Sequence, residues 1–198
     1  GSIIIFAAFI IPAQLKPFTF PSDDAYFYLQ IAKNVAAGNG STFHGITDTN
    51  GYHPLWMIIC SGLAFLAGGD NMLIIRFAMT FQHLLVIGVL YFFYKTAKIT
   101  GIKYFYIGFP LLMPYFLSIG TYGSECHLSG FLFILTFYYL IKNLNNFNNK
   151  SVFIFGIILA LLFLSRLDYV FYILTIFLFI FFSKNDGFAR ARFKNSFI

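Results

Sequence analysis

Residues 73–94 read LIIRFAMTFQHLLVIGVLYFFY. A helix needs about 20 mostly apolar residues to cross the hydrocarbon core of a bilayer, so this run predicts a membrane-spanning helix. Other apolar runs between charged or polar residues predict further spans, which gives about five spans over residues 73–183. These further runs are 104–120, 126–141, 151–165 and 168–183. We therefore expect an all-α fold, a polytopic transmembrane helix bundle.

The composition supports a membrane location. The chain is 59% hydrophobic, 22% aromatic and only 10% charged, with a mean hydropathy of +0.78. A soluble domain is about 45–50% apolar and about 25% charged. The net charge of +6 does not indicate a nucleic-acid partner, because the basic residues fall in short gaps between apolar runs and not on one face. We expect an integral membrane protein whose partner is the lipid bilayer.

The chain before residue 73 has a different organisation. Residues 1–12 are interpreted as the end of a first span, and residues 13–72 as an outer loop with two juxtamembrane helices, at about 24–37 and 54–68. The run 54–68 is short for a span and is expected to lie at the interface. Because both ends of the chain look cut, residues 1–198 are interpreted as the N-terminal part of a larger membrane protein.

The distribution of charge supports this arrangement. If 54–68 does not cross, nine of the 13 basic residues fall on one side and six of the seven acidic residues on the other. The positive-inside rule makes the basic side cytoplasmic, including the loop 184–198. If 54–68 does cross, every later loop changes side. The nine basic residues are Lys95, Lys98, Lys103, Lys142, Lys150, Lys184, Arg190, Arg192 and Lys194.

An acidic pair, Asp23 and Asp24, opens the expected helix at 24–37. Ionised carboxylates beside a membrane are costly, so the pair is interpreted as part of a functional site. The alternative is a helix start, where acidic side chains favour the helix dipole. The helix itself is expected to be amphipathic. Its predicted apolar stripe is Ala25, Leu29, Ala32 and Ala36, and its predicted outward side chains are Gln30, Lys33 and Asn34.

Further polar side chains are expected on the outer side of the membrane. They offer carboxylates for general-base catalysis and cations for an anionic ligand. Three of the carboxylates, Asp23, Asp24 and Glu125, are an alternative site for a divalent cation. The structural alternatives are a turn ion pair for Arg166 and Asp168, a snorkelling side chain for Arg76, and an aromatic belt for Tyr52. The candidates are Tyr52, His53, Arg76, Glu125, Arg166 and Asp168.

Three stretches in order resemble one superfamily. They are DDAYFYLQIAKNVAAGNGSTF followed by TNGYHPLW, then GSECHLSGFLF, then LSRLDYVF. The set is similar to the outer loops of GT-C membrane glycosyltransferases, which use polyprenyl-phosphate-linked sugars as donors. The resemblance implies an inverting transferase with its site on the outer face, in a bacterial inner membrane as part of cell-envelope synthesis. The alternatives are a lipid-linked-sugar transporter or flippase, and an inactive membrane subunit.

The resemblance also implies roles for individual residues. Asp24, or its neighbour Asp23, would be the catalytic base that activates the acceptor hydroxyl. Glu125 would be the second acid, near the sugar or a divalent metal, and Arg76 and Arg166 would bind the lipid phosphate. The remaining candidates for substrate binding are Tyr52, His53 and Asp168.

Overall fold

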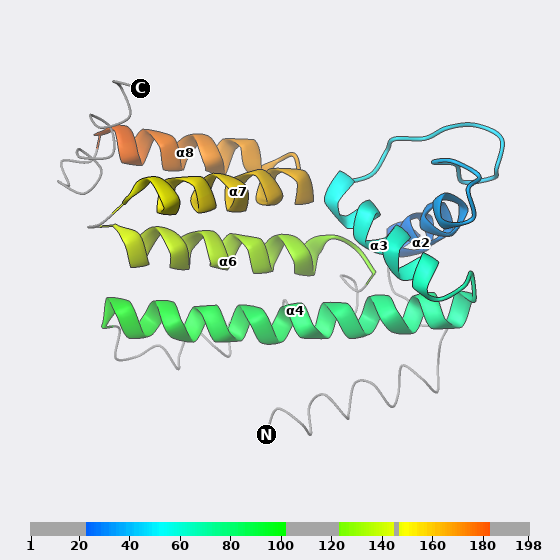
Figure 1. Ribbon diagram of the computed structural model, residues 1–198, viewed down its shortest axis with the longest axis horizontal. Helices are drawn as coiled ribbons and strands as arrows, with labels where there is room; N and C mark the ends of the chain where they lie inside the picture. Colours follow the sequence, from blue (N-terminus) through cyan, green and yellow to red (C-terminus); the bar gives the residue numbers. More distant parts are fainter. Residues whose placement is uncertain (1–22, 102–122, 145–146, 183–198) are drawn as a thin grey trace. The chain divides into compact units, whose positions relative to one another are not determined.

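The computed structural model describes residues 23–101, 123–144 and 147–182, which form six helices (Figure 1). The fold is all-α: in these ranges the extended pairing is limited to one bridge between Thr42 and Asp48. The expected first span at 1–12, the expected span at 104–120 and the loop 184–198 lie outside the described residues.

The chain divides into two compact units. The first takes in the described residues 23–87 and 123–128, and the second takes in residues 88–101, 129–144 and 147–182. The helix α4 (Asn71–Thr100) begins in the first unit and ends in the second.

In the first unit, α2 (Asp23–Ala36) packs against α3 (Pro54–Leu66). Helix α2 begins with the two aspartates, whose charge favours a helix N-terminus. It ends where Gly38 and Gly40 adopt φ of 80° and 75°, a backbone conformation that residues with a side chain rarely take. Helix α3 begins at Pro54, a residue suited to a first helical turn. Both helices that the sequence predicted before residue 73 are therefore present.

The buried face of α2 agrees only in part with the expected stripe. Ala25, Leu29 and Ala32 are buried as predicted, and Gln30 is exposed. Lys33 and Asn34, however, do not face away: both are half-buried and hydrogen-bonded to other segments. The prediction for these two residues was wrong because the turn after α2 and the start of α4 offer them polar partners.

The second unit is an aromatic-rich packing of helices around α6 (Cys126–Asn143). From α4, Phe92 contacts Phe131 and Tyr138 of α6. An added Cβ at Gly88 would lie 2.6 Å from the ring of Phe131, so a side chain there would require the ring to move. From α8 (Tyr169–Phe182), Tyr172 contacts Phe133 of α6.

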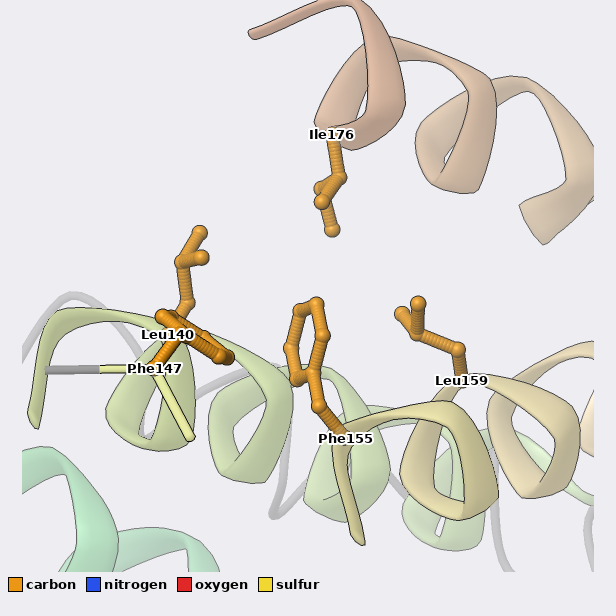
Figure 2. Packing of buried hydrophobic residues seen from close by; sticks show 5 residues of the cluster. All are labelled: Leu140, Phe147, Phe155, Leu159 and Ile176. Atoms are coloured by element: carbon orange, nitrogen blue, oxygen red, sulfur yellow. The ribbon is translucent and has the colours of Figure 1, made fainter. Parts of the chain in front are cut away.

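Helix α7 (Asn149–Ser165) completes the core of this unit. Phe155 packs at 6.1 Å, ring centre to ring centre, against Tyr139 of α6. Figure 2 shows Phe155 among the side chains of a cluster that joins α6, α7 and α8. The cluster is Leu140, Phe147, Phe155, Leu159 and Ile176.

One helix in the described part of the chain, α4, is long and apolar enough to cross a membrane. Its 30 residues correspond to about 45 Å, against a hydrocarbon core of about 30 Å. The expected spans at 126–141, 151–165 and 168–183 are present as helices α6, α7 and α8. The described parts of α7 and α8, at 17 and 14 residues, are shorter than a full span. The all-α class is confirmed, and the polytopic bundle stays a prediction.

Candidate functional site

The loop between α2 and α3 folds back onto α2. Asn34 donates from Nδ2 to the carbonyl oxygens of Thr42 and Phe43, at 2.8 and 3.1 Å. The ring of Phe43 stacks on that of Phe27 in α2, at 5.5 Å between centres. These contacts hold the first half of the loop against α2.

His53 is the residue that precedes α3 in an extended conformation. Its backbone N–H donates to the hydroxyl oxygen of Tyr28 at 3.0 Å. Its ring is half-buried, and the Nδ1 atom is buried with no hydrogen-bond partner in the described part of the chain. The start of α3 is thereby tied to the second turn of α2.

The turn before α6 is held by two buried side chains. Trp56 of α3 donates from its indole nitrogen to the carbonyl oxygen of Gly123 at 3.0 Å. Gln82 of α4 accepts from the N–H of Gly123 at 2.9 Å and donates to the carbonyl oxygen of Ser124 at 2.8 Å. Trp56 and Gln82 are fully buried, at 0% exposure, so the position of Glu125 is set by contacts that water does not reach.

Glu125 is buried between Tyr28 and His53. Its Oε1 atom lies 3.6 Å from Nε2 of His53, and its carboxylate accepts a hydrogen bond from the Tyr28 hydroxyl. Burial raises the pKa of Tyr28, and the nearby charge of Glu125 adds to that rise. Tyr28 therefore stays protonated and donates to Glu125 at neutral pH. We call these three residues, Tyr28, His53 and Glu125, the buried triad.

The acidic pair lies at the start of the same helix. Asp23 and Asp24 are both exposed in the first turn of α2. Residues four apart on a helix are neighbours on one face, which places Asp24 one turn before Tyr28. The structure thus brings three sequence-predicted candidates, Asp24, His53 and Glu125, to one region of the first unit.

Other candidates lie elsewhere. Tyr52 bonds to the hydroxyl of Ser41 at 2.7 Å, which holds the loop together. Arg76 is exposed on the second turn of α4. Arg166 and Asp168 belong to the second unit, where they form an ion pair of 2.9 Å at the start of α8. This ion pair is the turn contact that the sequence left open as the structural alternative.

The divalent-cation alternative is not supported by the geometry. Within residues 23–101, 123–144 and 147–182, no group of three or more His, Cys, Asp or Glu side chains could hold a metal ion. Asp23 and Asp24 are exposed at the start of α2, whereas Glu125 is buried against His53. The expected set of three carboxylates is therefore not assembled.

Three residues of this region escaped the sequence analysis. Tyr28, Trp56 and Gln82 looked like ordinary members of apolar helices, and their partners are far away in the sequence. Tyr28 carried one usable signal, since it follows Asp24 by one helical turn.

Comparison with protein families, with curated proteins and with solved structures gives no match to this chain.

Proposed function

We propose that the chain is a membrane glycosyltransferase of the GT-C type, which moves a sugar from a polyprenyl-phosphate donor to an acceptor hydroxyl on the outer face of the membrane. The observation that carries the proposal is the position of the buried triad one helical turn from Asp24. In this proposal α4, α6, α7 and α8 belong to a polytopic bundle, and α2 and α3 lie at the outer interface.

The two kinds of carboxylate suit two different tasks. Asp24 is exposed in the first turn of α2, where its carboxylate can accept a proton from an incoming hydroxyl. Glu125 is buried and already accepts from Tyr28, so it suits an oriented hydrogen bond to a sugar hydroxyl. The Nδ1 atom of His53 offers a second hydrogen-bonding position beside it.

The transfer step needs no nucleotide. The acceptor oxygen attacks the anomeric carbon of the sugar while its proton passes to Asp24. The bond between the anomeric carbon and the phosphate oxygen breaks, and the lipid phosphate leaves with that electron pair. Arg76, an exposed cation on α4, is the candidate partner of the phosphate in this unit.

The test is a transfer assay in membranes, with a panel of polyprenyl phosphates that carry radiolabelled sugars. Asp24→Asn keeps the size of the side chain and removes the proton acceptor, so we expect transfer to fall by about 10²- to 10⁴-fold. The matched control is Asp48→Asn, an exposed aspartate in the loop between α2 and α3. Transfer at the normal rate by the double variant Asp23→Asn, Asp24→Asn would refute the proposal.

A further inference from the structure

The first unit contains a cavity of about 660 Å³ between α2, the loop residue Phe43 and the first two turns of α4. Its volume lies within the range of about 300–1,000 Å³ that is usual for ligand sites. On α2 the cavity is lined by Tyr26, Leu29 and Gln30. At 100° per residue these positions face away from the side that carries Asp24 and Tyr28, so the cavity is separate from the buried triad.

The wall of this cavity is mainly apolar, with four aliphatic and two aromatic side chains among its eight lining residues. Leu29 faces Met72, Ile74 and Ile75 of α4 across it, and the polar groups in the lining include the amide of Asn71. An apolar wall with a small number of polar groups can accommodate an alkyl chain. The lining therefore favours the apolar part of an amphiphile.

The polar edge of the cavity is basic. Lys33 follows Leu29 by one helical turn, and its Nζ atom donates to Oδ1 of Asn71 at 2.8 Å. The acid at this edge, Asp70, caps α4 through a bond from the N–H of Leu73 at 2.9 Å. A cation beside an acid that already accepts a hydrogen bond favours an anionic headgroup.

The position of the cavity along α4 fits a lipid. Helix α4 is long and apolar enough to cross a membrane, and the residues that line the cavity belong to its first two turns. The end of a spanning helix lies where headgroups meet acyl chains. Leu73 and Phe77, in the same part of α4, are exposed apolar side chains, which would meet acyl chains if α4 crosses the membrane.

We propose that this cavity binds an anionic phospholipid of the surrounding membrane, with one acyl chain between α2 and α4 and the headgroup phosphate at Lys33. The proposal does not depend on sugar transfer. A bound lipid here would hold α2 against the start of α4 from the side opposite to the buried triad.

The test uses the purified protein in detergent micelles with phosphatidylglycerol that carries a photoreactive group on one acyl chain. Phosphatidylcholine with the same photoreactive chain is the neutral comparison. We expect phosphatidylglycerol to label the segments around Leu29 and Met72 preferentially. Lys33→Gln should lower its preference over phosphatidylcholine by about fivefold, whereas Lys98→Gln, at the other end of α4, should leave the preference unchanged.

Variants that fill the cavity distinguish labelling by a phospholipid bound inside it from labelling by lipid that contacts the protein surface. Ile75→Trp should abolish labelling of both segments, and the control Leu73→Trp, next to the cavity but outside its lining, should not. If Ile75→Trp does not give folded protein, Gln30→Trp fills the cavity from an exposed position of α2.

Three results would overturn the proposal. They are equal labelling by the two phospholipids, labelling that both filling variants leave unchanged, and displacement of the phospholipid by a polyprenyl phosphate at equal concentration. The last result would assign the cavity to a different lipid. The effect of Asp24→Asn on sugar transfer does not change any of these three labelling results. The proposal of phospholipid binding and the proposal of sugar transfer can therefore be refuted independently.

Discussion

The Nε2 atom of His53 lies 3.6 Å from the Oε1 atom of Glu125, joining the start of α3 to the turn that precedes α6. The contact is an ion pair when His53 is protonated, and the carboxylate keeps its hydrogen bond from Tyr28 in either state. A buried carboxylate that keeps the hydrogen bond from Tyr28 can exchange its contact with His53 for a ligand without being left unpaired.

Glu125→Gln tests whether this carboxylate serves the donor sugar. The change keeps the shape of the side chain and an oxygen that accepts from Tyr28, but removes the charge. We expect turnover of the donor to fall more than the affinity for the acceptor. The measurement is the transfer rate as each substrate is varied in turn. Equal loss for both substrates, or none, would remove Glu125 from the sugar site.

Tyr28→Phe tests the contribution of the triad to stability. The hydroxyl accepts from the N–H of His53 and donates to Glu125, and each of these groups loses that hydrogen bond when the hydroxyl is removed. Leaving a buried polar group without its partner costs about 1–3 kcal/mol. We expect a lower melting temperature in detergent. The control is Tyr26→Phe, since Tyr26 is exposed on the same helix, and an equal loss in both variants would contradict the prediction.

The pH dependence of stability follows from the same hydroxyl. Burial raises the pKa of Tyr28 above its ordinary value of 10.0, so the folded protein holds this proton more firmly than the unfolded chain. The stabilisation is complete below pH 10.0 and is lost as the pH rises through the folded-state pKa. Melting temperature should therefore fall at alkaline pH in the parent protein, and less steeply in Tyr28→Phe. If the melting temperatures of both proteins fall equally with rising pH, groups other than Tyr28 cause the loss of stability.

Gln82→Leu tests the support of the turn that carries Glu125. The variant fills a similar volume, but the N–H of Gly123 and the carbonyl oxygen of Ser124 lose their partner in a fully buried place. We expect a loss of about 1–3 kcal/mol for each unsatisfied group. The control Gln30→Leu, at an exposed position, should change stability by no more than about 0.5 kcal/mol. A variant at Gln82 as stable as this control would show that other contacts hold the turn.

Local signals predicted the helices of the first unit well. The acidic start of α2, the glycines that end it and the proline that opens α3 each act within a few residues, so they can be recognised in the sequence. The partners of Lys33 and Asn34 could not be predicted in this way. Helical periodicity reports which side chains are apolar, but not which carbonyl or amide group of another segment will meet a polar one.

The candidate site also combines residues that local sequence signals reveal with residues that only the fold reveals. Asp24 and Glu125 attracted attention as charges in an apolar chain, and His53 as a polar residue before Pro54. Tyr28, Trp56 and Gln82 act through contacts with distant segments, and a sequence without its fold does not contain that information. Helix α7 begins two residues before the expected span 151–165, because apolar composition does not determine where a helix begins.

The last prediction concerns the side of the membrane on which each loop lies. Helix α3 has 13 residues, about 20 Å, which is too short to cross a hydrocarbon core of about 30 Å. Figure 1 shows it oblique to the first part of α4, within the same unit. If α3 does not cross and α4 does, the start of α4 lies outside and its end, with Lys95 and Lys98, lies in the cytoplasm.

Cysteine labelling in intact cells measures this directly. In a background without Cys60 and Cys126, the free cysteines of the described chain, Lys98→Cys should react with a membrane-impermeant maleimide only after the cells are opened. The control is Thr47→Cys, an exposed position in the loop before α3, which should react in intact cells. Labelling of position 98 from outside would reverse the arrangement. Residues 54–68 would then have to cross despite the length of α3, and the site around Asp24 would no longer share a side with the expected outer loops.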